Sequence, residues 1–203
     1  MPDLFASEER LEKIPLEGAE LYYLAQMALP ESNDFLLSQL INDTPWKSET
    51  VTVWGKTFKQ PRLIAWYGDG DKNYRYSGIR LTPLPWTPLL LSIKKAVELT
   101  TKSSFNSVLL NYYRDNRDSM GFHSDDEPEL GSRPTIASLS LGGERTFILK
   151  HKEKKSSRPI RLLLKSGSLL LMTGDTQKNW KHGIDKETRR IDARVNLTFR
   201  TIL

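Results

Sequence analysis

From residue 107 onward, short apolar runs alternate with turn residues. The runs cover 108–113, 135–141, 146–151, 160–164, 168–172 and 194–202, and glycine-containing turns such as Gly142-Gly143, Ser166-Gly167 and Gly174-Asp175 separate them. Short apolar runs bounded by such turns are typical of strands, and no helical crossover pattern lies between them. The pattern therefore predicts a sandwich or a jelly roll rather than a parallel α/β sheet.

The part of the chain before residue 107 mixes helical and extended patterns. Apolar residues at 36, 37, 40 and 41 share one helical face after a helix entrance at 30–33. Thr87-Pro88 resembles an N-cap with proline at the first helical position, and the helix that follows should end near Thr101. Strands are expected at 21–24, 50–54, 58–67 and 74–78. The whole pattern predicts a mainly β fold with flanking helices, of the α+β class.

Composition narrows the class of protein. A length of 203 residues suits one domain with a sizeable core. The chain has no cysteine, which excludes disulfides, thiolate zinc sites and cysteine nucleophiles. No apolar run reaches transmembrane length, and the charged N-terminal segment does not resemble a signal peptide. We therefore expect a soluble, intracellular protein.

The charge is basic, with a formal net charge of +5 and a pI of about 9.3. Such a balance suits a polyanionic partner, although solubility alone explains it equally well. Aromatic and basic residues interleave between 54 and 76, including Trp54, Arg62, Tyr74 and Tyr76. That mixture is typical of a nucleic-acid surface, and equally of a hairpin with core aromatics and solvated cations. The dense charge run at 150–158 has the same two interpretations: a solvated loop or a nucleic-acid contact.

The segment 111–127 contains His123-Ser-Asp125, the only His-x-Asp of the chain. On an extended segment these two side chains point to one face, so both can bind one metal ion. Of the other two histidines, His151 lies in the basic run, so His182 is the better third ligand. Two histidines and a carboxylate form the facial triad that suits Fe(II) oxygen chemistry. An ordinary surface turn is the alternative for His-x-Asp alone.

A second constellation lies near the C-terminus, at 194–200. On a strand, Arg194, Asn196, Thr198 and Arg200 share one face. Inward guanidinium groups are costly without an anion, and a small dicarboxylate would supply one. The alternative is that Asp or Glu residues of the protein pair with them. Asn111 and Tyr113, two apart on another strand, add polar groups to the same interior.

Taken together and in this order, these motifs resemble the AlkB family of Fe(II)- and 2-oxoglutarate-dependent dioxygenases, and within it the members that act on double-stranded DNA. The residues that carry the resemblance are N-x-Y at 111–113, H-x-D at 123–125, His182 and R-x-N-x-T-x-R at 194–200. Similarity continues upstream through 53–56, 61–62, 67–69 and 76–78, so it covers roughly residues 50–203. The ordered set is specific, whereas each single motif is not.

The resemblance implies a double-stranded β-helix, or jelly roll, with an N-terminal nucleotide-recognition extension. We expect one catalytic domain over 1–203, with helices and recognition hairpins over about 1–100 and the jelly-roll core over about 101–203. The implied cofactors are Fe(II), 2-oxoglutarate as cosubstrate, and O2. The implied roles are the following: metal ligands His123, Asp125 and His182; 2-oxoglutarate contacts Asn111, Tyr113, Arg194, Asn196 and Arg200; and base or DNA contacts Trp54, Arg62, Tyr74, Tyr76 and Glu127.

The implied function is oxidative demethylation of N-alkylated bases in DNA, chiefly 1-methyladenine and 3-methylcytosine, with release of formaldehyde, succinate and CO2. Trp54 is larger than the phenylalanine finger of the duplex-acting members, and the 150–158 loop is shorter than theirs. Single-stranded DNA and RNA therefore stay open as substrates, as does a non-catalytic nucleic-acid-binding module. We expect a monomer without membrane contact, in the cytoplasm or nucleoid of a bacterium or in a eukaryotic nucleus.

Overall fold

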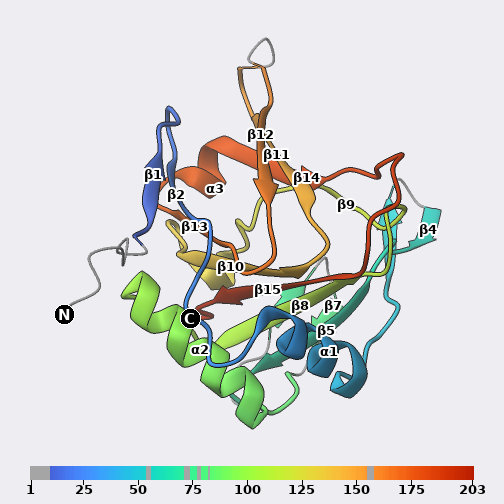
Figure 1. Ribbon diagram of the computed structural model, residues 1–203. Coiled ribbons are helices and arrows are strands. Elements are labelled where there is room, and N and C mark those ends of the chain that lie inside the picture. Colours follow the sequence, from blue (N-terminus) through green and yellow to red (C-terminus); the bar gives the residue numbers. More distant parts are fainter. Residues whose placement is uncertain (1–9, 54–55, 71–73, 77–78, 82, 155–157) are drawn as a thin grey trace, which may run out of the picture.

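Two antiparallel sheets form the body of the molecule, and helices cover one of them (Figure 1). The computed structural model describes residues 10–53, 56–70, 74–76, 79–81, 83–154 and 158–203. Within this part of the chain, no helix is both long enough and apolar enough to cross a membrane.

The larger sheet has seven strands in the order β1-β2-β13-β10-β15-β8-β5. Strands from the N-terminal part lie at both edges, because β2 pairs with β13 and β5 pairs with β8. The portions before and after residue 100 therefore share one sheet. The bounds are β1 Glu12–Ile14, β2 Glu20–Leu24, β5 Leu63–Gly68, β8 Ser107–Tyr113, β10 Ile136–Gly142, β13 Leu169–Thr173 and β15 Arg194–Arg200.

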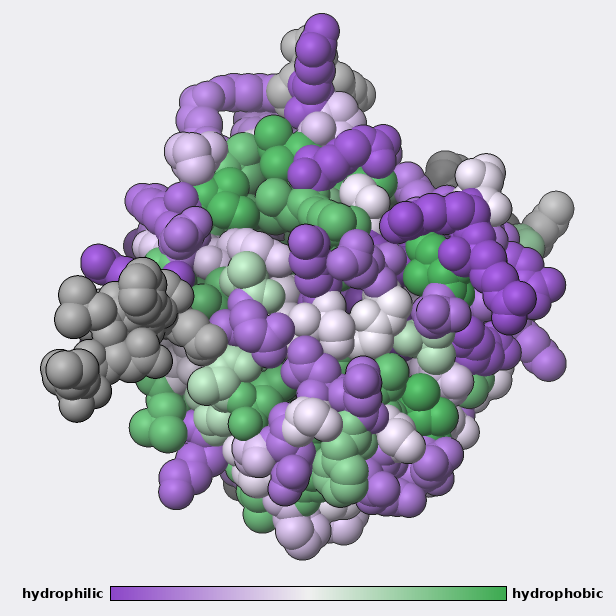
Figure 2. All heavy atoms as spheres, viewed as in Figure 1, coloured by the Kyte–Doolittle hydropathy of each residue, from purple (hydrophilic) through white to green (hydrophobic). Residues whose placement is uncertain are grey.

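The smaller sheet has four strands in the order β12-β11-β14-β9 and faces the larger one. Its bounds are β9 Met120–His123, β11 Arg145–His151, β12 Ile160–Leu164 and β14 Trp180–Ile184. The β11–β12 hairpin projects from the body, and hydrophilic side chains follow it (Figures 1 and 2). Two further hairpins are formed by β3 Thr50–Val53 with β4 Lys56–Lys59, and by β6 Tyr74–Tyr76 with β7 Ile79–Leu81.

The two long helices are α1, Asn33–Asp43, and α2, Pro88–Thr101. Each starts at a side-chain cap: Ser32 Oγ accepts from Phe35 N at 3.3 Å, and Thr87 Oγ1 accepts from Leu90 N at 3.2 Å. Both helices pack on the outer face of the larger sheet, where their apolar residues join one core cluster with β8, β10 and β15. A four-residue helix, α3 (Thr176–Asn179), links β13 to β14, and a 3₁₀ turn spans Pro128–Leu130.

A second apolar cluster fills the space between the two sheets. It joins residues such as Tyr113, Ile136 and Met172 of the larger sheet to Phe147 and Leu149 of the smaller one. Two facing antiparallel sheets with flanking helices confirm the predicted mainly β, jelly-roll-like class. The predicted helices and the strands after residue 107 are present. However, the pattern of apolar runs did not predict β9, α3 or β14, which are short and carry polar residues.

Candidate functional site

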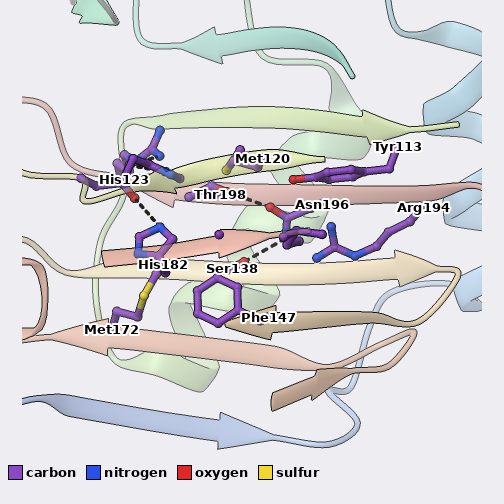
Figure 3. A pocket seen from close by; sticks show the side chains of 14 residues that line it. Tyr113, Met120, His123, Ser138, Phe147, Met172, His182, Arg194, Asn196 and Thr198 are labelled. Atoms are coloured by element: carbon purple, nitrogen blue, oxygen red, sulfur yellow. Dashed lines mark hydrogen bonds and ion pairs between the residues drawn. The ribbon is translucent and has the colours of Figure 1, made fainter. Parts of the chain in front are cut away.

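A pocket lies between the two sheets, and two different groups of side chains lie toward its opposite ends (Figure 3). His123 and His182 lie at one end, whereas Arg194 and Tyr113 lie at the other. The lining between them is mixed, with the polar Asn196, Ser138 and Thr198 and the apolar Met120 and Phe147. The pocket is therefore elongated and carries a different chemistry at each end.

The first end brings together His123, Asp125 and His182, whose ligand atoms all lie within 4.8 Å of one another. The distance from His123 Nε2 to Asp125 Oδ1 is 3.6 Å, and that from His182 Nε2 to Asp125 Oδ2 is 3.9 Å. The two histidines are cross-strand partners on β9 and β14, with ring centroids 4.4 Å apart. The predicted triad therefore converges, although His182 lies 57 residues after Asp125 in the sequence.

Local hydrogen bonds leave the metal-facing nitrogen of His123 available. His123 Nδ1 lies 2.9 Å from the carbonyl oxygen of Gly121. A carbonyl can only accept, so Nδ1 carries the proton and the lone pair is on Nε2, the atom that faces Asp125. This is the usual arrangement of a metal-binding histidine, whose second nitrogen donates to the protein.

The charges at this end suit a divalent cation. Burial acts to raise the pKa of Asp125, but the cation of Arg200 and the two histidines outweigh it and hold that pKa at about 2. Arg200 Nη2 donates to Asp125 Oδ1 at 2.8 Å. Burial, followed by the proximity of His123, lowers the pKa of His182 to about 3. At neutral pH the site thus offers an ionised carboxylate and a neutral imidazole, the forms that bind metal.

The other end of the pocket holds a buried cation. Arg194 is 1% exposed, and burial lowers its pKa to about 10, so it stays charged at neutral pH. Nη2 donates to Ser140 Oγ at 3.0 Å, while Nε and Nη1 are buried and make no hydrogen bond to any described residue. The Tyr113 ring lies 5.0 Å from Arg194 Cζ. A buried guanidinium cation that keeps unused donors fits an anionic group, so this end fits one terminus of a dicarboxylate such as 2-oxoglutarate.

Strand register explains why these polar groups meet. β15 lies between β8 and β10, so that Arg194 is opposite Tyr113 on one side and Gly142 on the other. Every second residue of β15, namely Arg194, Asn196, Thr198 and Arg200, lines the pocket, while the residues between them belong to the outer core cluster. The predicted division of this strand into a polar and an apolar face is confirmed.

Asn111 lies opposite Asn196 in the β8–β15 pairing and is 1% exposed. Its Oδ1 accepts from Arg62 Nε at 2.7 Å, and its buried Nδ2 has no hydrogen-bond partner among the described residues. Arg62 is 5% exposed, so it supports Asn111 from within the fold. Its contact with DNA stays a prediction.

The residues predicted to contact the base lie on other segments. Glu127 is half-buried and directly precedes the 3₁₀ turn that follows the metal-binding loop. Tyr74 and Tyr76 lie on β6, in the β6–β7 hairpin. Trp54 falls outside the described residues. The roles of these four residues stay predictions.

Sequence reasoning missed several residues of this region. Ser138 and Ser140 lie two apart on β10: Ser138 Oγ accepts from Asn196 Nδ2, and Ser140 Oγ accepts from Arg194 Nη2. Their S-x-S spacing within an apolar run was an available signal. Gln177 and Arg145 are also buried beside the site. Neither has a sequence signal of its own, because their roles depend on segments that meet only in the folded chain.

Comparison with known proteins agrees with this geometry. Residues 20–200 match the model of the 2OG-Fe(II) oxygenase superfamily. The mouse alpha-ketoglutarate-dependent dioxygenase alkB homolog 3 is 45% identical over 177 residues, covering 83% of this chain and 61% of the relative. The mouse DNA oxidative demethylase ALKBH2 is 44% identical over 159 residues, covering 75% of this chain and 66% of the relative. These two identities are so close that they assign the chain to neither branch.

More distant relatives extend the match. The Arabidopsis thaliana DNA oxidative demethylase ALKBH2 is 35% identical and covers 92% of this chain and 67% of that protein. The solved structure of OsALKBH1 shares the fold, with a TM-score of 0.64 at 18% identity, and covers 93% of this chain and 100% of that chain. The chain spans about three fifths of the length of the mammalian alkB homolog 3 proteins that it matches. With the family model and these relatives in agreement, the chain belongs to the AlkB family of the 2OG-Fe(II) oxygenase superfamily.

Proposed function

We propose that this protein is an Fe(II)- and 2-oxoglutarate-dependent demethylase that removes N-alkyl groups from 1-methyladenine and 3-methylcytosine in DNA. The observation that carries the proposal is the pocket itself. A triad of metal-binding side chains lies at one end, and a buried guanidinium with two unused donors lies at the other. The names of the ALKBH2 relatives as DNA oxidative demethylases support nucleic acid as the substrate.

His123, Asp125 and His182 would hold Fe(II). Arg200 donates to Asp125 Oδ1, which keeps that carboxylate ionised and fixes its rotation. A set of two histidines and one carboxylate would leave room on the metal for 2-oxoglutarate and O2. The role of the protein at this end is to keep the vacant positions on the side that faces the pocket.

Arg194 would pair with the distal carboxylate of 2-oxoglutarate through its guanidinium group, with Tyr113 beside it. Asn111, Asn196 and Arg200 would support the end of the cosubstrate near the metal. The buried Nδ2 of Asn111 supports this role, because Arg62 occupies only its Oδ1. A ligand with a carboxylate at each end would thus be oriented along the pocket.

On the substrate side, Trp54 would fill the gap left by a flipped base, Tyr76 and His123 would sandwich that base, and Tyr74 would line its pocket. Glu127 would accept from the exocyclic amino group. Removing a base from the stack costs a few kcal/mol, and less for a lesion that cannot pair, which favours methylated bases before any contact is made.

Fe(II) with 2-oxoglutarate and O2 supplies the oxidation of the N-methyl carbon, after which formaldehyde leaves the base and succinate and CO2 are the other products. The side chains of this protein would bind and orient the cosubstrate and the methylated base, and would exclude water. Met120, Phe147, Met172 and Ile184 supply the apolar part of the pocket lining, which would help to keep bulk water from the reacting carbon.

The test is turnover on three matched oligonucleotides that carry one 1-methyladenine: duplex DNA, single-stranded DNA and RNA of the same sequence. Mass analysis should show loss of the methyl group from DNA, with one formaldehyde and one succinate per methyl lost. His123→Ala is the control and should abolish the reaction while leaving the protein folded.

Two other outcomes would overturn the proposal. Turnover on RNA equal to or better than on either DNA would make RNA the substrate of the same chemistry. Binding of all three oligonucleotides without any succinate release, in wild type and His123→Ala alike, would show a nucleic-acid-binding module without catalysis.

A further inference from the structure

The loop that carries two of the three triad residues leaves its sheet at His123. The last cross-strand pair between β9 and β14 is His123 with His182, and the ladder is irregular between His182 and Ile184. Ser124 and Asp125 therefore lie beyond the paired strand, yet Asp125 is 1% exposed and must be placed accurately. Something other than the sheet has to hold this loop.

Arg200 holds the Asp125 side chain from β15, and two further hydrogen bonds lead from this loop to the segment between β13 and His182. The backbone N–H of Asp125 donates to Gln177 Oε1 at 3.0 Å. The hydroxyl of Ser124 donates to the carbonyl oxygen of Trp180 at 2.9 Å. The loop with His123 and Asp125 is thereby joined to the segment that ends in the third triad residue.

Gln177 is itself anchored at its other end. It is 2% exposed on the short helix α3, and its Nε2 donates to Met172 Sδ at 3.4 Å. Met172 lies within the larger sheet, paired with Ile136 of β10 and Leu21 of β2. The side-chain amide of Gln177 thus connects the larger sheet to the backbone of Asp125, and both its oxygen and its nitrogen make a hydrogen bond.

We propose that Gln177 is a positioning residue that sets the Asp125 carboxylate against His123 and His182 before the metal binds. It touches neither metal nor cosubstrate, and acts only through the backbone of Asp125. Groups that orient metal ligands typically contribute 10–100-fold to metal affinity, and the same size of effect is expected here. Gln177 acts on the metal site alone, so its effect does not depend on which nucleic acid is the substrate.

The test is titration of the metal-free protein with Co(II), followed by visible absorption, which reports both affinity and ligand geometry. Gln177→Leu keeps the volume and removes both hydrogen bonds, so its Co(II) affinity should fall by about 10-fold or more with an altered spectrum. Gln177→Glu has a side chain of the same length and keeps an oxygen that can accept from the Asp125 N–H. Its Co(II) affinity should therefore stay within about threefold of wild type.

Asn179→Ala is the matched control, because Asn179 lies on the same helix and donates to the carbonyl oxygen of Gly18, away from the metal-binding loop. It should leave the affinity and the spectrum unchanged. Hydrogen exchange of the peptide containing Asp125, measured without metal, should rise in Gln177→Leu and stay at the wild-type level in Asn179→Ala.

Wild-type Co(II) affinity in folded Gln177→Leu would overturn the proposal, as would an equal loss in Asn179→Ala or in Gln177→Glu. If Gln177→Leu does not fold, Gln177→Asn replaces it. The shorter amide keeps the site polar but does not reach the Asp125 N–H, so it should show the same loss of affinity. Undiminished affinity in that variant would equally refute the role.

Discussion

At the scale of one residue, Arg194 is unfavourable for the stability of the free protein but suited to binding a ligand. A fully buried guanidinium with two nitrogens that bond to no described residue is costly to the free protein. The same two donors become useful when a carboxylate enters. An apolar residue of similar length would fill this space without the free-energy cost of burying a charge. The presence of arginine here therefore indicates a role in binding an anion.

Replacing Arg194 with methionine should therefore weaken 2-oxoglutarate binding without destabilising the free protein. We expect the dissociation constant of 2-oxoglutarate for the Mn(II)-loaded protein to rise by at least about 30-fold, measured by calorimetry. The free energy of unfolding in urea without ligand should stay equal or increase. Arg161→Met, at an exposed position of β12, is the control. Undisturbed 2-oxoglutarate binding in Arg194→Met would refute the assignment.

His182 predicts a pH dependence of stability for the metal-free protein. Its pKa is about 3 in the folded state and about 6.5 when unfolded, so the unfolded chain binds more protons between these values. Stability from this group is complete above pH 6.5 and is lost as the pH falls toward 3.

Between pH 7 and pH 5, the wild type should accordingly lose about 2 kcal/mol more of its unfolding free energy than His182→Gln does. Urea unfolding in the presence of a chelator measures this difference. If the unfolding free energies of the two proteins depend on pH in the same way, the pKa of His182 is not lowered in the folded state.

At the scale of the element, β15 joins the apolar core to the polar pocket. Its odd-numbered members Val195, Leu197 and Phe199 are fully buried in the cluster beneath the helices, while Thr198 faces the pocket. A shift of one residue in register would exchange these two faces. The strand is therefore fixed by packing on one side, which in turn places the site residues on the other.

Substitutions on the two faces of β15 should differ in their effect on folding. Leu197→Ala should lower the free energy of unfolding by about 2–5 kcal/mol, because it leaves a cavity in a tightly packed core. Thr198→Val should cost no more than about 1 kcal/mol, the contribution of its hydrogen bond to Asn196 Oδ1. Equal losses in urea unfolding would mean that the two faces are not as distinct as the structure shows.

The sequence predicted those elements whose pattern is local. The period of two at 194–200, the helix entrance at 30–33, the cap at Thr87 and the apolar runs after residue 107 each lie in one stretch of chain, and the structure has them. It did not predict β9 and β14, because each is four or five residues long and is held by its partner rather than by its own composition. Gln177 was missed for the same reason: its contacts join segments separated by 52 residues.

At the scale of the whole molecule, Arg145 joins loops that surround the pocket. It is 0% exposed, and its guanidinium donates to the carbonyl oxygens of Asp115, Asp118 and Asp185 at 3.3, 2.8 and 2.7 Å. Its Cζ lies 5.4 Å from the Tyr113 ring, which Arg194 also contacts. The connections before β9 and after β14 are thus fixed to β11.

Arg145→Met should consequently destabilise the protein by about 3–5 kcal/mol, because the buried carbonyl of Asp118 and the part-buried carbonyls of Asp115 and Asp185 lose their donor. This is the reverse of the result expected for Arg194→Met, although both residues are buried arginines beside Tyr113. Thermal or urea unfolding of the two variants side by side makes the comparison. Similar stability in both would contradict the distinction between a structural and a ligand-binding arginine.

The central claim is that one pocket holds a metal ion at His123, Asp125 and His182 and a keto acid at Arg194. It is tested most directly by anaerobic titration of the protein with Fe(II) and 2-oxoglutarate, followed by O2 and a methylated oligonucleotide. The account predicts one equivalent of each bound, then one succinate formed for each methyl group lost, with both absent in His123→Ala. Binding of 2-oxoglutarate that is indifferent to Fe(II), or methyl loss that persists in His123→Ala, would contradict it.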